Sequence, residues 1–522
     1  MQITKREFLK KLGAGGEGGD PSARPRHHGA AEGAPGAQRF YLRYDMESYF
    51  SRRFFIGGAL SFGALAGCRT LVRAGVAASG TPRLKLGVLS DIHLYKAGDE
   101  KTLERALAYF RDHGAEAVLI AGDFADTGCI FQAKMLADAW FRTFPNDTAP
   151  DGRHVERLFI YGNHCVDGWT YNSNVENRKD SAWAPREAIG FGDNRAKVWR
   201  ELFHEDYRPI WMKTVKGIPV IGAHWDARGI AIEDFMREHG KELDPSVPFL
   251  YTQHAHPKDT CFGSWAWGHD DGRATRALSP FPNAVAFSGH SHYTLVDERS
   301  VWQGAFTSIN TASLKYASSD YSLRENFWGN SSGFKGETRP HRMNGVDTSD
   351  GREGMLVSVF DDHLAIERRE FVYGQSLGDD WTVPLPAAES KPFSYAARAA
   401  KRAAPAFADG AAVAVEIVPP KDKDDFTHVE LAFPAAAAVD NCRVCEYEVT
   451  AVLCEDDVEL VQAQRRMMSP DFYLPRTKLV PSVGFTFAVE DLPLRGRYRF
   501  EVRALECFGK KGDKIVSPIV VI

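Results

Sequence analysis

The stretch Leu84-Lys85-Leu86-Gly87-Val88-Leu89-Ser90-Asp91-Ile92-His93 decides how this chain is interpreted. Its apolar residues predict a short buried strand over 84–90. Two potential metal ligands, Asp91 and His93, follow the strand directly. Because ligands of open α/β sheets gather beyond the carboxyl ends of strands, this stretch predicts a functional site at the edge of a sheet.

The residues that follow alternate between short apolar strands and amphipathic helices, which is typical of a layered α/β domain. Asp99 can cap a helix that runs to about His113. Helical spacing returns at 131–144. The further strands that we expect lie at 117–121, 155–161, 219–223, 248–252, 284–288 and 355–360.

Polar side chains end most of these strands. Asp123 follows the second strand, and Asn163 with His164 follows the third. Later strands lead to Gln253-His254-Ala255-His256-Pro257 and to Ser288-Gly289-His290-Ser291-His292. Carboxylate oxygen combined with imidazole nitrogen suits zinc, manganese or iron. Each residue alone is better explained as a turn former, a helix cap or a buried histidine, but the ordered series favours a metal site.

This ordered series resembles the calcineurin-like metallophosphoesterase family. The motifs that carry the resemblance are Asp91-Ile92-His93, Gly122-Asp123-Phe124-Ala125-Asp126, Gly162-Asn163-His164, the His254 segment and Gly289-His290-Ser291-His292, within residues 83–374. The resemblance implies a four-layer α/β/β/α sandwich and a hydrolase of phosphate esters. It implies two divalent or trivalent ions, manganese, iron or zinc, that share a hydroxide.

The resemblance also implies a role for each matched residue. One ion would be held by Asp91, His93, Asp123 and His292, and the other by Asp123, Asn163, His254 and His290. Asp123 would bridge the two ions. His164 would protonate the leaving oxygen, and Asp126 would orient its imidazole as in a general-acid dyad.

Departures from the family pattern narrow the choice of subfamily. Protein serine/threonine phosphatases carry Arg and Glu where this chain has Thr127 and Cys165, which disfavours a protein phosphatase. Purple acid phosphatases place Tyr where Asp126 stands, so the mixed-valent iron site of that subfamily is not expected here. His256 is the alternative to His254 as a ligand, and we favour His254 because it follows the strand directly. His224 is not included among the predicted site residues.

The substrate stays open. A phosphodiester and a phosphomonoester both fit, with an acid-phosphatase-like monoesterase as one alternative. A surface binding protein with a vestigial metal site is the alternative from another class. The long insertions 165–217, 257–283 and 315–353 are the segments expected to choose the substrate. Their tryptophans could build a cap or stack on an organic group, but we favour the interpretation that most of them pack the insertions themselves; they are Trp169, Trp183, Trp199, Trp211, Trp265, Trp267 and Trp328.

An export signal is predicted at residues 46–68. Ser51-Arg52-Arg53-Phe54-Phe55-Ile56 resembles a twin-arginine signal, and Leu65-Ala66-Gly67-Cys68 resembles a lipobox whose Cys68 would carry a lipid. The apolar run is shorter than the roughly 20 residues that a membrane-spanning helix needs. We therefore expect an exported protein of the cell envelope or periplasm, anchored to the membrane by lipid. A buried helix is the alternative reading.

The rest of the chain completes the predicted organisation. Residues 1–45 form a low-complexity segment that need not be translated, 69–82 a tether, and 375–411 an Ala/Pro-rich linker. Period-two strands in 412–522 predict an all-β sandwich that resembles fibronectin type III, with Tyr498 as a tyrosine corner. A formal net charge of −5 leaves no broad basic field for nucleic acid. The lone Cys442/Cys445 pair is weak support for a zinc site.

Overall fold

The computed structural model describes the chain from Gly80 onward, in the ranges 80–171, 186–227, 230–263, 266–317, 351–388, 391–421, 427–437, 443–455, 458–469, 472, 481–492 and 494–522. The predicted low-complexity segment, the export signal with Cys68, and Trp183, Trp265, Trp328 and Cys442 lie outside these residues. Across the described ranges, no helix is both long enough and apolar enough to cross a bilayer.

The first sheet contains the strand that opens the sequence argument. Strands β1 (Leu84–Leu89), β2 (Ala117–Ile120) and β3 (Glu156–Phe159) pair in parallel. The other edge of β1 pairs antiparallel with β10 (Glu353–Val359). The sheet runs in the order β12-β11-β10-β1-β2-β3, with β11 at His363–Glu370 and β12 at Gln375–Ser376.

The second sheet supplies the later histidines. Its order is β4-β5-β6-β7-β9-β8, and β5, β6, β7 and β9 pair in parallel. The bounds are β4 Ile210–Val215, β5 Ile218–Ala223, β6 Phe249–Thr252, β7 Ala284–Ser288, β8 Val301–Gln303 and β9 Thr307–Asn310.

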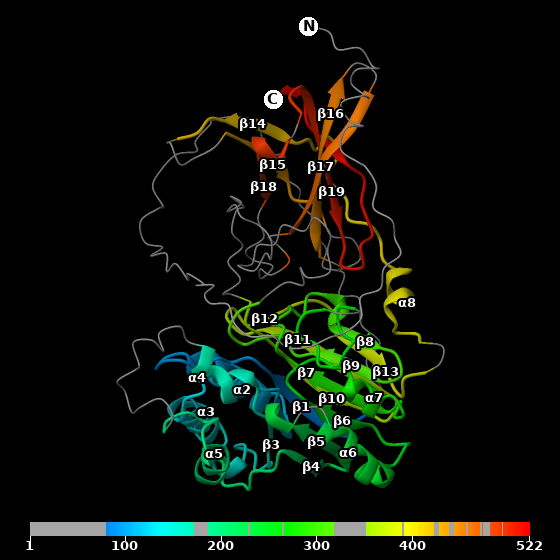
Figure 1. The fold of residues 1–522 in the computed structure, drawn as a ribbon. Helices are drawn as coiled ribbons and strands as arrows, with labels where there is room; N and C mark the ends of the chain where they lie inside the picture. The colour runs from blue at the N-terminus through cyan, green and yellow to red at the C-terminus, as the bar shows by residue number, and fades with distance from the viewer. Residues whose placement is uncertain are drawn as a thin grey trace, which may run out of the picture. The chain divides into compact units, whose positions relative to one another are not determined.

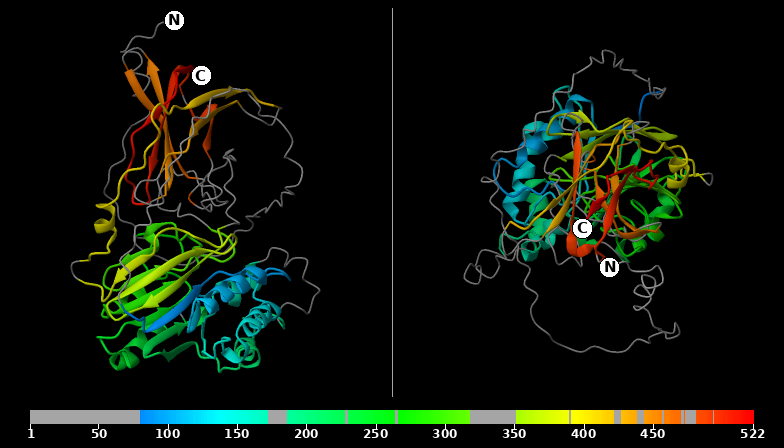
Figure 2. Two further views of the ribbon diagram at one scale, coloured as in Figure 1. Left: turned by 180° about the vertical axis from the view of Figure 1, so that it is seen from behind. Right: turned by 90° about the horizontal axis from the view of Figure 1, so that it is seen from above.

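Strand side chains alternate between two cores, as the pleat requires. Leu86, Leu250 and Val285 belong to one buried cluster that draws on both sheets. Val118 and Ile120 instead pack with helices α2 (Glu100–Asp112) and α3 (Ile130–Thr143). The outward residues of the second sheet pack with α6 (Ile230–His239) and α7 (Arg273–Leu278). Figure 1 labels these elements, and the view from above in Figure 2 shows the cyan and the green helices on opposite sides of the strands.

The predicted strands and helices of this region are confirmed, with ends displaced by a few residues. The expected linker at 375–411 begins too early. Strands β12 and β13 (Trp381–Pro384) both pair with β11, so they extend the first sheet. Buried Trp381 and Val383 provide the apolar side chains that hold this edge strand in place. Helix α8 (Tyr395–Ala399) lies in the remainder of the expected linker.

The described residues from 414 onward form strands in two separate pairing sets. One set runs β14-β15-β18 and the other β17-β16-β19-β20, with β21 also on β19. Their bounds are β14 Ala414–Val418, β15 His428–Pro434, β16 Glu446–Glu455, β17 Val458–Met468, β18 Ser482–Ala488, β19 Arg497–Leu505, β20 Ile515–Val516 and β21 Val520–Val521. The buried Tyr498 donates its hydroxyl to the Leu494 carbonyl at 2.6 Å.

Candidate metal centre

The predicted ligands lie on loops that leave the carboxyl ends of the parallel strands. Backbone hydrogen bonds tie these loops together beyond the sheets, with His93 N donating to Asp123 O at 2.9 Å and Gly289 N donating to His254 O at 2.9 Å. These two bonds join loops that are 30 and 35 residues apart in sequence, and the His290 amide, which donates to Asp91 Oδ2, joins loops 199 residues apart. The remaining loop, after β3, starts helix α4 (Asn163–Tyr171).

The backbone at this site is strained. Asp91, His93, Asp123, His290 and His292 all have a positive φ, between 46° and 69°. Such a left-handed conformation is uncommon outside glycine and persists only where the surroundings enforce it. Its recurrence at these positions indicates that the fold gives up local stability to aim the side chains at a common point.

Each central carboxylate is satisfied on one oxygen only. Asp91 Oδ2 accepts hydrogen bonds from Ser90 Oγ at 2.6 Å and from His290 N at 2.9 Å. Asp123 Oδ1 accepts from His164 N at 2.7 Å. The second oxygen of each carboxylate is therefore left to face the imidazoles. Sequence reasoning missed Ser90 and these backbone amides, which carry no side-chain signal in a motif.

Hydrogen bonds on the far side of two rings fix their tautomers. His254 Nδ1 lies 2.7 Å from the Ala121 carbonyl, and His93 Nδ1 lies 3.0 Å from Asp126 Oδ1. Both partners are acceptors, so each Nδ1 carries a proton, and in the neutral ring each Nε2 would present its lone pair to a cation. This is the arrangement that metal-ligating histidines use.

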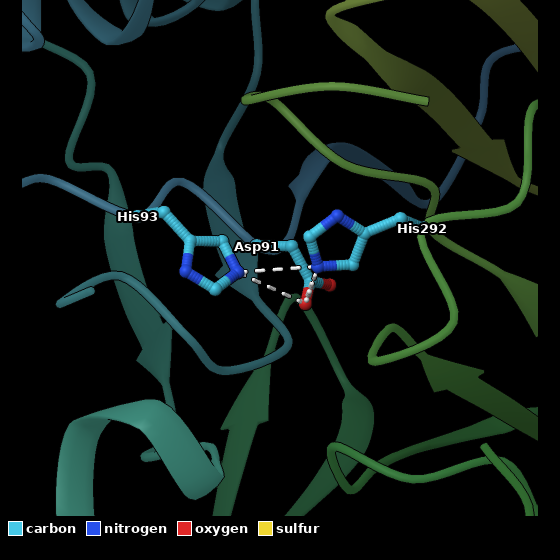
Figure 3. Close-up of side chains that lie close together, drawn as sticks. All are labelled: Asp91, His93 and His292. Carbon is cyan, nitrogen blue, oxygen red and sulfur yellow. Dashed lines mark hydrogen bonds and ion pairs between the residues drawn. The ribbon is translucent and has the colours of Figure 1, made fainter. Parts of the chain in front are cut away.

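The free donor atoms converge. Within the described residues, ligand atoms group within 4.8 Å as Asp91/His93/His292, as Asp123/His254/His290 and as His93/Asp126/His164. In the first group, which Figure 3 shows, His292 Nε2 lies 3.0 Å from Asp91 Oδ1 and 3.1 Å from His93 Nε2. In the second, His254 Nε2 lies 2.9 Å from Asp123 Oδ2.

Several of these atoms are buried without a hydrogen-bond partner among the described residues, namely Asp91 Oδ1, Asn163 Oδ1 and His254 Nε2. A buried polar atom without a partner costs free energy. Lone pairs that face one another at such distances are explained when a cation lies between them. The residues therefore fit metal ions, and the first two groups divide the predicted ligands as the resemblance implies.

The pKa shifts of the buried groups also favour a cation at this site. Burial by itself would raise the pKa of Asp91, but the facing His292 and His254 hold it well below its usual range. Burial by itself would lower the pKa of His93, yet its hydrogen bond to the Asp126 carboxylate and the nearby Asp91 and Asp123 carboxylates raise it to about 10. Burial likewise opposes the carboxylates at His254, whose pKa rises to about 9. The site thus attracts positive charge.

The expected pairing of the Asp126 carboxylate with His164 is not what the structure shows. That carboxylate contacts His93, while His164 Nδ1 lies 2.7 Å from the backbone carbonyl of Asp126. Asp126 therefore holds two imidazole rings. Its side chain holds the predicted ligand His93, and its backbone carbonyl holds His164. Burial lowers the pKa of His164 below its ordinary value.

Neither of the two histidines left open by the sequence belongs to a donor group among the described residues. His256 is buried, with Nδ1 2.7 Å from Ser288 Oγ and Nε2 2.8 Å from Ser291 Oγ. His224 accepts the Tyr161 amide at 2.9 Å, and burial lowers its pKa to about 3. Both are placed as structural residues.

Close backbone approach is required at Gly162. A Cβ there would overlap Asp123 Oδ1 and would lie 2.6 Å from the Asp123 amide nitrogen. Any larger residue would displace the central carboxylate.

A cavity of about 150 Å³ opens over these groups. Its lining residues are Asp123, Asn163, His164, Trp267, His290, Ser291, His292 and Tyr316. Four of the predicted metal ligands, the predicted acid His164 and two aromatic side chains therefore line the same cavity.

Comparison with known proteins agrees with this geometry. Residues 84–294 match the family model described as calcineurin-like phosphoesterase, which supports a domain of this kind in that part of the chain. This domain supports a metal-binding hydrolase of phosphate esters, without a specific substrate. No curated protein matches the chain.

The solved structures that the chain matches include a predicted phosphoesterase from Streptococcus pneumoniae, 11% identical over 58% of this chain and 97% of that chain, with a TM-score of 0.24. Another is a dimetal phosphatase from Danio rerio, 11% identical over 58% of this chain and 99% of that chain, with a TM-score of 0.29.

Proposed function

We propose that this chain hydrolyses phosphate esters at a dinuclear metal centre. The observation that carries the proposal is the convergence of bare carboxylate and imidazole lone pairs in two adjoining groups. Asp91, His93 and His292 would hold one ion, and Asn163, His254 and His290 the other. Asp123 Oδ2 would bridge them, because it lies 2.9 Å from His254 Nε2 and 4.0 Å from His93 Nε2.

Ions bound there would activate water and neutralise phosphoryl oxygens. The chain's own residues define the rest of the reaction. His164 Nδ1 is held by the Asp126 carbonyl, so the doubly protonated ring would carry its second proton on Nε2 and pass that proton to the departing alkoxide. The Asp126 carboxylate keeps His93 in the tautomer that binds metal. His164 therefore acts on the leaving group directly, whereas Asp126 acts indirectly by orienting the predicted metal ligand His93.

Two further features complete the proposal. The C-terminal strands and the Tyr498 to Leu494 hydrogen bond support a fibronectin type III-like sandwich, because the tyrosine corner of such domains bonds to backbone a few residues upstream. The predicted signal and Cys68 support an enzyme anchored by lipid in the cell envelope.

The test uses the full chain, stripped by a chelator and reloaded with Mn²⁺, Fe²⁺ or Zn²⁺. Turnover of 4-nitrophenyl phosphate and bis(4-nitrophenyl) phosphate would distinguish a monoesterase from a diesterase. We expect metal-dependent turnover of at least one ester and loss of both metal and turnover in Asp123→Ala. The matched control is Asp138→Ala, an exposed carboxylate on α3 that pairs with Lys134. An active Asp123→Ala variant would refute the mechanism.

A further inference from the structure

The side chains around the cavity mouth are aromatic. Trp267 is 52% exposed, and its ring stacks on His290 with centroids 4.9 Å apart and an angle of 17° between the planes. Tyr316 is 45% exposed and lies against His292, with centroids 4.4 Å apart. Each ring thus covers a predicted ligand and also faces solvent.

The cavity is too small to enclose a whole organic phosphate. Its volume is about 150 Å³, whereas pockets that enclose drug-sized ligands are about 300 to 1,000 Å³. The space over the donor groups therefore suits the phosphoryl group. The organic part of an ester must lie at the mouth, against Trp267 and Tyr316.

Trp267 stands on a segment that is fixed in place. The adjacent Gly268 carbonyl accepts the His256 amide at 2.9 Å, and the Asp270 amide donates to the His256 carbonyl at 2.8 Å. Both imidazole nitrogens of His256 are held by serines. An exposed indole on so firmly held a segment is a pre-organised platform, because little further order is lost when a ligand binds.

Tyr316 is anchored to the metal site as well. Its amide donates to Ser313 Oγ at 3.3 Å, and that hydroxyl donates to the Asp91 carbonyl at 3.0 Å. The rim is therefore tied to the same backbone that positions the ligands, on both sides of the cavity.

We propose that Trp267 and Tyr316 form a stacking subsite that selects phosphate esters carrying a planar ring, as in nucleoside phosphates. This inference rests on the proposed function, because the phosphoryl group must occupy the metal site. Trp267 provides the stacking platform, and Tyr316 borders the ring on the other side.

The experiment compares esters that differ in ring content. If the enzyme is a diesterase, the ring-bearing substrate is thymidine 5′-(4-nitrophenyl phosphate) and the ring-free substrate is methyl 4-nitrophenyl phosphate. Both release the same leaving group. Thymidine 5′-phosphate and ethyl phosphate, both esters of primary alcohols, serve for a monoesterase. The measured quantity is the ratio of kcat/KM for the ring-bearing ester to that for the ring-free ester, with metal content checked in every variant.

We expect Trp267→Leu to lower this ratio by about 5- to 150-fold, which corresponds to the loss of one aromatic stacking partner by a base. Trp267→Phe keeps a stacking face and should retain most of the ratio. Phe131→Leu is the matched control, because Phe131 is an exposed aromatic on α3 that does not line the cavity. As a readout without turnover, Trp267→Leu should weaken calorimetric binding of thymidine 5′-phosphate more than that of inorganic phosphate.

An unchanged ratio in a folded, metal-loaded Trp267→Leu variant would overturn the stacking subsite and leave the phosphoesterase intact. If the wild-type protein turns over 4-nitrophenyl phosphate or bis(4-nitrophenyl) phosphate but none of these four esters, the stacking subsite alone is refuted. If it turns over no ester at all, the proposed function fails and this inference fails with it.

Discussion

The Asp126 carboxylate offers a sharp test of how the centre is assembled. Its Oδ1 lies 3.0 Å from His93 Nδ1, on a ring that is only 4% exposed. Asp126→Ala removes this acceptor but keeps the backbone carbonyl that holds His164. The substitution therefore separates the two rings that one residue serves.

The size of the effect follows from that contact. A buried N–H left without an acceptor costs about 1 to 3 kcal/mol. The ring can avoid this cost only by moving its proton to Nε2, which would then point toward the ion. Loss of such a partner typically weakens metal binding by about 10- to 100-fold, which equals about 1.4 to 2.8 kcal/mol. We expect Asp126→Ala to lose metal affinity in this range and Asp126→Asn, which keeps an acceptor oxygen, to lose less.

The assay is a metal titration of the chelator-stripped full chain, followed by calorimetry and by recovery of phosphate-ester turnover. Most of the activity of Asp126→Ala should return at high metal concentration. Asp138→Asn is the control on exposed carboxylates. Wild-type metal affinity with a lowered kcat would refute the reasoning, since the carboxylate would then act on His164.

The other predictions concern local packing, pH and export. Gly162→Ala should lower both metal content and melting temperature because its Cβ overlaps Asp123, whereas Gly152→Ala, on an open turn, should retain the metal; equal metal content in both variants would contradict this. Burial raises the pKa of Glu353 to about 7 from its ordinary value of 4.5, so the folded state is favoured below that ordinary value and loses the advantage as pH rises toward 7. Relative to Glu353→Gln, the wild-type protein should lose roughly 3 kcal/mol of unfolding free energy between about pH 4 and pH 8, and a pH-independent difference in denaturant unfolding would count against it. Cys68→Ser should move the protein from the membrane fraction to the soluble fraction of a bacterial host, and retention of the variant in the membrane would argue against the lipid anchor.

Much of the fold and of the site could be predicted because both depend on local patterns. A buried strand that ends in Asp91 and His93 is readable from alternation and residue type. The convergence of Asn163 with His290 was readable only through the resemblance, because nothing local in the sequence specifies contacts between the two sheets.

The features that sequence reasoning missed depend on tertiary contacts. The Asp126 carboxylate contacts His93 because of the geometry of the loops, which cannot be predicted from the spacing of these residues in the sequence. Strand β13 was assigned to a linker because its neighbours are rich in proline and alanine, and only its pairing with β11 makes it part of the sheet. The position of Trp267 over His290 follows from the hydrogen bonds of His256, a residue that the sequence offered only as an alternative ligand.

The central claim is best tested by counting metal ions in the purified full chain after loading and dialysis, by elemental mass spectrometry. Two tightly held ions per chain in the wild-type protein, with loss of both in Asp123→Ala, is the result that we expect. A single ion, or two ions that persist without the Asp123 carboxylate, would contradict a shared dinuclear centre.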